Sequence, residues 1–332
     1  MADRQRGSAG DIPLKKRLYA WFRIVRPPII FIGVFGSTVT ALVFEGGPGA
    51  ISFSTPTGLW TFVISMFCWG MLWGGIMVHN DYTDLKSDMV NRPHKPIPSG
   101  AIRPTTAHRV GLAMMTLGWL VPPAVNILNG PEYALSSLWW GFTLWLVGVV
   151  YNYWGKNWGV LGHALVAWGV ALIPLYGGAL VSPVFGFSML FPLFIAIFVS
   201  EIGREIVVCA GDYYGDLQQG WKTVPVLIGR KRAMQLVPIF FAGFIPFYPI
   251  PYFGWLGYPR FFSDYYFVGY TIFIVGLYLC WAAIYWTMTH TTDEKRIWRA
   301  FEIYARTITR LLIIFTQFVM LAEALWGAGA RW

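Results

Sequence analysis

Long apolar segments separated by short polar loops constrain this chain more than any other feature. A run of about 17 to 25 apolar residues is long enough to cross a bilayer as a helix. By this criterion we predict nine spans, centred near residues 36, 68, 118, 143, 170, 198, 241, 275 and 316. Several contain Gly or Pro, which membrane helices tolerate better than soluble helices do. The sequence therefore predicts an all-α, polytopic membrane protein with nine transmembrane helices.

Composition supports this class and argues against others. Of the 332 residues, 56% are apolar and 12% are charged, whereas soluble domains carry roughly 25% charged residues. The net charge is +9, but the basic residues lie in short loops between apolar runs, which favours contact with membrane lipid and argues against a nucleic-acid partner. Cys68, Cys209 and Cys280 lie in apolar runs without metal-binding spacing, so we expect them to be packing residues.

The N-terminal segment and the loops predict the topology. Residues 1–13 lack periodicity and should form a flexible cytoplasmic tail. Residues 14–26 combine basic and apolar side chains, as an interfacial helix does, and residues 14–332 should form one transmembrane domain. The polar, basic start argues against a cleaved signal peptide.

The basic residues of the loops predict the orientation. With a cytoplasmic N-terminus, every Lys and Arg except Arg260 and Arg331 falls on the cytoplasmic side, as the positive-inside rule requires. If the source is a eukaryote, we expect the protein to reside in the membrane of the endoplasmic reticulum.

A first polar motif directly follows the second predicted span. Residues 79–103 read HNDYTDLKSDMVNRPHKPIPSGAIR, which sets Asn80, Asp84 and Asp88 four residues apart. On a helix these side chains lie on one face, about one turn apart. We call these three residues the first acidic motif.

A second acidic motif, Asp212 and Asp216, has the same spacing and follows the sixth span. The predicted topology places both motifs at the cytoplasmic end, where soluble diphosphates and Mg²⁺ are available. Acids in or beside membrane spans are usually functional. The alternative is that they cap helix ends or pair with nearby cations such as Arg204 and Lys222.

Glu201 and Glu205 extend the second motif along the same helical arc. The same two interpretations apply to Glu201, which either belongs to a site or pairs with Arg204. The histidines are scattered without a metal-binding pair, so we expect satisfied polar residues rather than ligands.

Carboxylates at this spacing suit Mg²⁺, which takes oxygen ligands and often shares its shell with substrate phosphates. A diphosphate held in this way also needs cations that neutralise the leaving group. The candidates are Arg92, Lys95 and Lys156. Arg92 and Lys95 are alternatively positive-inside anchors. Beside Lys156, Tyr151, Asn152 and Tyr153 could donate hydrogen bonds, and the two tyrosines alternatively belong to an interfacial aromatic belt.

Three segments resemble signatures of the UbiA superfamily of intramembrane prenyltransferases. The chain reads NDYTDLKSDMVNRPHKPIPSG where the family has NDxxDxxxD followed by NRPxRPIPSG. It reads GDYYGDLQQGWKTVPVLIG where the family has DxxGD followed by GxxTxP. The segment YNYWGKNWGVLGH is similar to the family's Tyr and Lys segment that opens the fifth helix.

This resemblance implies an all-helical fold around a central cavity, with two Mg²⁺ ions bridging an isoprenyl diphosphate to the protein. The implied metal ligands and catalytic residues are Asn80, Asp84, Asp88, Asp212 and Asp216. The implied substrate contacts are Arg92, Lys95, Tyr153, Lys156, Arg204 and Lys222.

The sixth helix departs from the family pattern. Relatives often read REIVKDxEDxEGD, whereas this chain reads REIVVCAGDYYGD. Val208, Cys209 and Gly211 therefore stand where Lys, Asp and Glu are expected, and His163 replaces a usual Asn. These losses lie one or two turns inside the metal site, where a polar acceptor would be held.

Three functions remain open on this evidence. The departures favour a terpene cyclase like the fungal UbiA-type enzymes, in which a C15 or C20 isoprenyl diphosphate ionises and the cation closes on its own double bonds. An aromatic content of 18% suits such a cation. The alternative is a prenyltransferase with an aromatic or alcohol acceptor. A cation transporter also uses buried carboxylates, but it leaves the NRPxKPIPSG loop unexplained.

Overall fold

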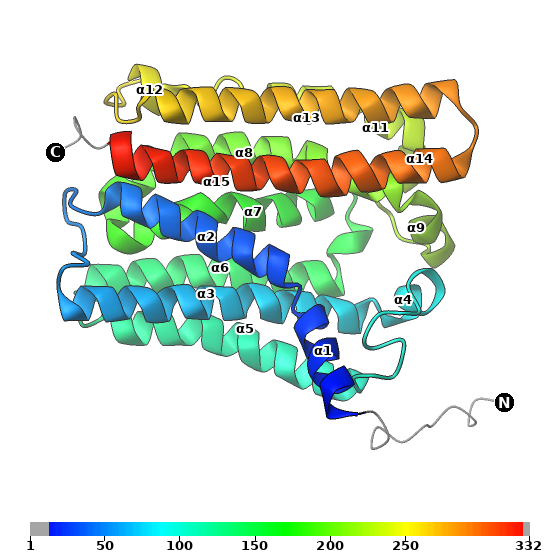
Figure 1. Cartoon of the computed structure of the whole chain (residues 1–332), viewed down its shortest axis with the longest axis horizontal. Coiled ribbons are helices and arrows are strands. Elements are labelled where there is room, and N and C mark those ends of the chain that lie inside the picture. The colour runs from blue at the N-terminus through cyan, green and yellow to red at the C-terminus, as the bar shows by residue number, and fades with distance from the viewer. Residues whose placement is uncertain (1–12, 328–332) are drawn as a thin grey trace.

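The computed structural model describes residues 13–327, and within this range it contains helices and no strands (Figure 1). A helix lies at each position where a span was predicted. These helices are α2 (Pro27–Phe44), α3 (Pro56–Thr83), α5 (Pro104–Asn126), α6 (Pro131–Tyr153), α7 (Val160–Val181), α8 (Pro183–Gly211), α11 (Arg230–Ala242), α13 (Asp264–His290) and α15 (Thr309–Trp326). The predicted tail, apart from Pro13, and Arg331 lie outside the described residues.

Seven segments of the described chain are long and apolar enough to cross a membrane. They are α2, α3, α6, α7, α8, α13 and the continuous helical segment Glu294–Trp326, which ends in α15. The helices at the other two predicted positions fall short, because α5 begins with the polar sequence PTTAHR and α11 has only 13 residues. The all-α membrane class is confirmed, and the count of nine spans is approximate.

Short helices complete the chain. They are α1 (Leu14–Ile24), α4 (Leu85–Asn91), η1 (Gly155–Asn157), α9 (Tyr213–Gln219), α10 (Val224–Ile228), α12 (Ile250–Phe253), α14 (Glu294–Ala300) and the π-helical segment η2 (Phe301–Ile308). The predicted interfacial helix corresponds to α1, which exposes Leu14, Leu18 and Phe22 while burying Ala20 and Ile24. Its end is set by Pro27 and Pro28, which begin α2.

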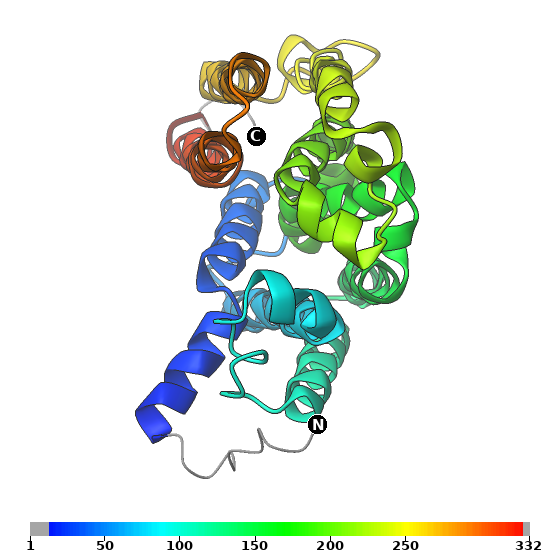
Figure 2. The ribbon, with the colours of Figure 1, turned by 90° about the vertical axis from the view of Figure 1, so that its right-hand side faces the viewer.

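The long helices pack around a buried apolar core. Helix α2 contacts α3, α7 and α15, and α3 packs along α5 while α7 packs along α8. At the centre, Trp69 of α3 stacks on Tyr176 of α7 with ring centroids 3.8 Å apart. Elsewhere in the bundle, small residues allow the helices to approach closely, as at Gly177 of α7. Figure 2 views the bundle along these helices and shows α4 and α9 at the end nearest the viewer. This end carries both acidic motifs.

Gly177 permits the contact between α2 and α7. A Cβ atom at this position would lie 1.9 Å from the Ser37 carbonyl oxygen and 2.4 Å from Thr40 Oγ1. The Ser37 hydroxyl also donates a hydrogen bond of 2.7 Å to the Ile173 carbonyl, so the two backbones are fixed side by side.

We therefore expect Gly177→Ala to destabilise the bundle by roughly 1 to 3 kcal/mol, the usual cost of overpacking. Thermal unfolding in detergent would measure this as a lower midpoint. Gly169→Ala on the same helix is the control, because its Cβ would meet only side chains, the nearest being Leu144 at 3.3 Å. Equal midpoints for the two variants would contradict the assigned contact.

Candidate active site

The first acidic motif continues the helical path across a break. Helix α3 ends at Thr83 and α4 begins at Leu85, with Asp84 between them. The Asp84 amide donates to the Asn80 carbonyl at 2.9 Å, and the Asp88 amide donates to the Asp84 carbonyl at 2.8 Å. These i to i+4 bonds keep the spacing that the sequence predicts.

The second acidic motif has the same construction. Helix α8 ends at Gly211 and α9 begins at Tyr213, so Asp212 stands between a long and a short helix as Asp84 does. The Asp216 amide donates to the Asp212 carbonyl at 3.0 Å. The buried Asp216 carboxylate accepts a hydrogen bond of 3.1 Å from Thr223 Oγ1.

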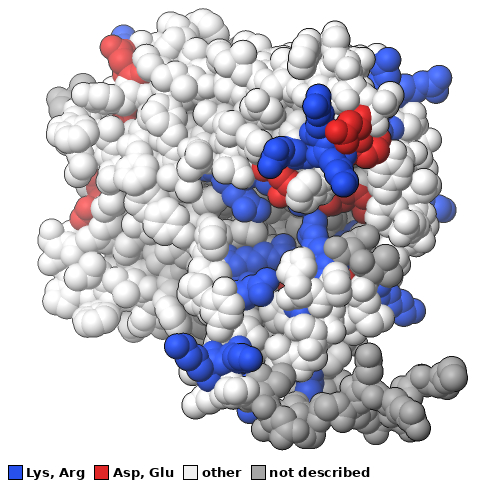
Figure 3. All heavy atoms as spheres, turned by 45° about the vertical axis from the view of Figure 1, so that its right-hand side comes forward, with Lys and Arg blue, Asp and Glu red and all other residues white. Residues whose placement is uncertain are grey.

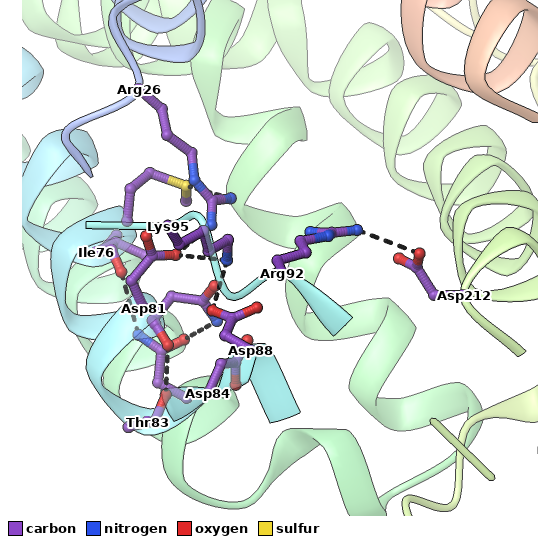
Figure 4. A network of polar contacts seen from close by, with 12 residues as sticks. Arg26, Ile76, Asp81, Thr83, Asp84, Asp88, Arg92, Lys95 and Asp212 are labelled. Carbon is purple, nitrogen blue, oxygen red and sulfur yellow. Dashed lines mark hydrogen bonds and ion pairs between the residues drawn. The ribbon is translucent and has the colours of Figure 1, made fainter. Parts of the chain in front are cut away.

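Basic side chains join the two motifs. Arg92 Nη2 lies 3.2 Å from Asp212 Oδ1 and thereby links the segment after the first motif to the second (Figure 4). Lys95 Nζ lies 2.6 Å from Asp88 Oδ2, and Lys156 forms an ion pair with Asp84. The three cationic residues predicted from the sequence therefore all form ion pairs with carboxylates of these two motifs.

Burial shifts the pKa values of three groups in this cluster. It raises the pKa of Asp88, against the hydrogen bond from Lys95. Burial, followed by the nearby Asp212 charge, raises the pKa of Asp216 to about 7. Burial also lowers the pKa of Lys156 to about 7, against the attraction of Asp216. Poorly solvated carboxylates that repel one another favour a bound cation.

Asn80 contributes an oxygen to the same face. Its Nδ2 donates to Asn152 Oδ1 at 3.0 Å, and Asn152 in turn donates to the Ile76 carbonyl at 3.3 Å. Because the amide nitrogen is held in this way, the Asn80 carbonyl oxygen is the atom left for a ligand. The two motifs thus offer only oxygen donors, which is the donor set that Mg²⁺ takes.

Three predicted substrate contacts lie apart from this network. The Tyr153 hydroxyl lies 3.3 Å from His79 Nε2. Arg204 Nε donates to both carboxylate oxygens of Glu201, at 2.6 and 2.7 Å, which matches the interpretation of Glu201 as an ion-pair partner. Lys222 is exposed. The roles of these three residues remain predictions from resemblance.

Sequence reasoning missed several charged residues of the site. Asp81 is 3% exposed, and its Oδ1 lies 2.5 Å from Arg26 Nη2 and 3.0 Å from Lys95 Nζ (Figure 4). Arg306 Nη2 lies 2.6 Å from Asp212 Oδ1. A signal was available, because charged residues in or beside membrane spans are costly and usually functional. Their partners, however, lie more than 50 residues away in the sequence for Arg26 and Arg306.

Gly211 explains how Arg306 reaches the second motif. A Cβ atom on Gly211 would lie 3.1 Å from Phe301 Cγ, so this glycine lets η2 pack closely against the end of α8. The segment η2 is π-helical, a rare geometry often found at functional sites, and it carries Arg306. The missing acid at position 211 therefore has a packing reason.

His163, Glu205 and Cys209 come together inside the bundle, with one ligand atom of each within 4.8 Å of the others. The Val224 amide donates to His163 Nε2 at 3.3 Å, so the neutral ring carries its proton on Nδ1. That nitrogen faces Cys209 Sγ at 3.9 Å. His163 thus has a backbone hydrogen-bond partner, and the described cysteines are free thiols; that the histidines are not metal ligands stays a prediction.

Comparison with known proteins identifies the family. Residues 35–308 match the model of the UbiA prenyltransferase family, which is more than half of the chain. The chain belongs to the UbiA prenyltransferase family. It is accordingly an integral membrane enzyme of the UbiA type.

Relatives of this UbiA family member include archaeal enzymes. The digeranylgeranylglyceryl phosphate synthase of Pyrococcus abyssi is 31% identical over 222 residues, covering 67% of this chain and 73% of the relative. The enzyme of the same name from Ignicoccus hospitalis is 31% identical over 166 residues, covering 49% and 52%.

Solved structures support the fold of this family member. An apo UbiA homologue from Aeropyrum pernix K1 aligns with a TM-score of 0.68 at 15% identity, covering 91% of this chain and 99% of that one. A UbiA homologue from Archaeoglobus fulgidus bound to DMAPP and Mg²⁺ aligns with a TM-score of 0.58 at 17% identity, with the same coverage. Figure 1 and these alignments agree on an all-helical UbiA fold.

The contrast between two lysines of this UbiA enzyme is testable. Lys156 pairs with Asp84 and lies 4.6 Å from the Trp221 ring centroid, whereas Lys222 is exposed. We expect Lys156→Ala to lower kcat about 10²-fold, the typical loss when one charge-stabilising donor is removed. Lys222→Ala should stay close to wild type. Steady-state turnover of an isoprenyl diphosphate measures kcat of both variants. An equal fall in kcat would show that the exposure of these lysines does not distinguish a substrate contact from a surface residue.

Proposed function

We propose that the protein transfers an isoprenyl group from an isoprenyl diphosphate to an acceptor, in a Mg²⁺-dependent reaction. The observation that carries this proposal is the meeting of the two acidic motifs through Arg92, which pairs with Asp212, and Lys156, which pairs with Asp84. Opposed carboxylates with cations between them suit a metal-bound diphosphate. The A. fulgidus homologue bound to DMAPP and Mg²⁺ is consistent with this assignment.

The residues of the two motifs would hold Mg²⁺ through their side-chain oxygens. They are Asn80, Asp84, Asp88, Asp212 and Asp216. Bound Mg²⁺ supplies charge neutralisation to the diphosphate. Arg92, Lys95 and Lys156 lie on the same carboxylates, and we assign them to the diphosphate oxygens, where they stabilise the negative charge that grows as the leaving group departs.

The bond between C1 of the isoprenyl group and the diphosphate breaks, and its electron pair leaves with the diphosphate. With an alcohol acceptor, a lone pair of the hydroxyl oxygen forms a new carbon–oxygen bond to C1 and the hydroxyl proton is released. With an aromatic acceptor, π electrons form a carbon–carbon bond to C1 and a ring proton is released. Trp221 covers Lys156, and this cover would limit the access of water, which competes with the acceptor for the cation.

The balance between transfer and cyclisation now favours transfer. The cyclase interpretation relied on Val208, Cys209 and Gly211, but Gly211 packs against Phe301 and Cys209 faces His163. The family model that matches is that of prenyltransferases, and the relatives' name, digeranylgeranylglyceryl phosphate synthase, supports a C20 donor rather than a C15 donor, since a geranylgeranyl group has 20 carbons. We retain the cytoplasmic orientation of the site as part of this proposal.

The test is acceptor dependence. Membranes containing the protein are incubated with a C20 isoprenyl diphosphate and Mg²⁺, with and without a glyceryl phosphate carrying one long ether chain or a phenolic acid. We expect a new prenylated product only when an acceptor is added, because the acceptor supplies the atom that captures C1. A cyclic hydrocarbon formed without acceptor would overturn the proposal and support the cyclase.

The two acidic motifs should also be required individually. We expect Asp88→Ala and Asp216→Ala each to lower turnover at least ~10²-fold, because each removes charge stabilisation needed in the ionising step. EDTA should abolish activity and excess Mg²⁺ should restore it. Asp264→Ala is the control, since Asp264 is an exposed acid at the start of α13 whose partners, Tyr252 and Arg260, lie outside the two motifs. Wild-type rates in both motif variants would contradict a two-motif metal site.

A further inference from the structure

A histidine lies buried beneath the charged end of the bundle. Figure 3 shows acidic and basic side chains gathered at the end that carries both acidic motifs. His79 directly precedes Asn80 on α3, and it is 0% exposed. Both of its ring nitrogens have partners, because Nδ1 lies 3.2 Å from Asn152 Nδ2 and Nε2 lies 3.3 Å from the Tyr153 hydroxyl. The imidazole thus connects the partner of Asn80 to a predicted substrate contact.

The carbonyl of Ile76 fixes the direction of the Asn152 amide. This carbonyl oxygen lies 3.3 Å from Asn152 Nδ2, and a carbonyl oxygen can only accept a hydrogen bond. The NH2 group of Asn152 therefore faces Ile76, and its oxygen faces Asn80 Nδ2 at 3.0 Å. Because that oxygen also only accepts, Asn80 turns its NH2 group toward Asn152. The direction set by one backbone carbonyl thus passes through two amides to the oxygen of Asn80.

His79 reinforces this direction. The NH2 group of Asn152 has a second hydrogen, and His79 Nδ1 lies within hydrogen-bond distance of it. Since the NH2 group donates, Nδ1 accepts, and the neutral ring carries its proton on Nε2. If the Asn152 amide turned over, its oxygen would face Nδ1 and the Ile76 carbonyl, which are both acceptors. His79 and Ile76 together therefore oppose reversal of Asn152.

The direction of Asn80 matters because an amide offers a cation one suitable atom. Its oxygen can bind Mg²⁺, whereas its NH2 group is a donor only. Asp84 and Asp88 present a carboxylate oxygen in either orientation, so Asn80 is the member of the first acidic motif that depends on such guidance. Groups that orient metal ligands typically change metal affinity by about 10- to 100-fold.

The other ring nitrogen of His79 sets the direction of a second hydrogen bond. With its proton on Nε2, the ring donates to the oxygen of Tyr153. The two rings meet edge to face, with centroids 5.1 Å apart, and Tyr153 is 45% exposed at the end of α6. The hydroxyl proton of Tyr153 is therefore left to donate to another oxygen.

We propose that His79 and Asn152 are positioning residues, which hold the oxygen of Asn80 toward the bound cation and keep the Tyr153 hydroxyl as a donor to the diphosphate. Neither residue binds the metal itself. This inference rests on the proposed function and adds to it the groups that select the ligand atom of Asn80. His108 provides a contrast, because its ring lies 5.4 Å from that of His79 but its Nδ1 has no hydrogen-bond partner in the described part of the chain.

The first test measures Mn²⁺ binding without substrate, followed by the electron paramagnetic resonance signal of the free ion. Mn²⁺ takes the same oxygen donors as Mg²⁺. We expect His79→Phe and Asn152→Leu each to weaken Mn²⁺ binding about 10-fold or more, because each removes hydrogen bonds that orient Asn80. His79→Asn should recover most of the affinity, because its Oδ1 is as many bonds from Cβ as Nδ1 of histidine is, and can accept from Asn152.

A double-mutant cycle separates positioning from general damage to the fold. In the Asn80→Ala background, His79→Phe should weaken Mn²⁺ binding no further, because no amide is left to orient. His108→Phe is the matched control and should bind Mn²⁺ as wild type does. Additive losses in the cycle, or an equal loss in His108→Phe, would overturn the proposal. If gel filtration shows that His79→Phe is misfolded, the same cycle with Asn152→Leu decides.

The second test measures binding of inorganic diphosphate at saturating Mg²⁺, where a weakened metal site is still filled. We expect His79→Phe to weaken this binding to the level of Tyr153→Phe, and His79→Gln to restore it, because the Gln amide nitrogen can donate to Tyr153. Wild-type diphosphate affinity in His79→Phe would remove Tyr153 from the proposal. Neither test needs an acceptor, so the expected binding pattern without any prenylated product would contradict only the proposed transfer.

Discussion

The structure depends on holding several carboxylates close together at one end of an apolar bundle. Like charges in a poorly solvated site repel one another, so each acid of the two motifs needs a cation or a hydrogen-bond donor. Lys95 forms an ion pair with Asp88, Lys156 forms one with Asp84, and Thr223 donates a hydrogen bond to Asp216. The connecting segments at this end supply these partners, since Lys95 and Thr223 lie in loops and Lys156 lies in η1, and the long helices fix the distance between the two motifs. The loops are therefore as much a part of the site as the spans.

Sequence alone predicted the features that depend on local spacing. Apolar runs gave the helix positions, and the i to i+4 pattern gave the shared face of Asp84 and Asp88, because both follow from the geometry of one helix. Contacts between distant segments were not predictable in this way. The pairing of Arg26 with Asp81, and of Arg306 with Asp212, depends on how helices pack. Exposure, which separates Lys156 from Lys222, is likewise a property of the folded chain.

The sixth helix shows how a lost functional group can mislead. Gly211 suggested that an acceptor site had been removed, but the position is occupied by the close approach of Phe301. The same segment, η2, carries Arg306, which pairs with Asp212. The absence of an acid at position 211 is thus accompanied by a basic side chain from another helix on the second acidic motif. The sequence pattern around position 211 cannot reveal this contact, because the two residues are 95 positions apart in the sequence.

The π-helical segment before α15 has a consequence for how such enzymes diverge. A π turn closes its hydrogen bond over one residue more than an α turn, so deletion of a single residue from η2 would restore regular winding. Because the π turn absorbs one extra residue locally, the side chains of α15 would keep roughly their orientation, while those within η2 would move. Arg306 lies within η2 and would lose the position from which it reaches Asp212, without any loss of the helical span. One codon gained or lost in this segment would therefore change the charge beside the second acidic motif.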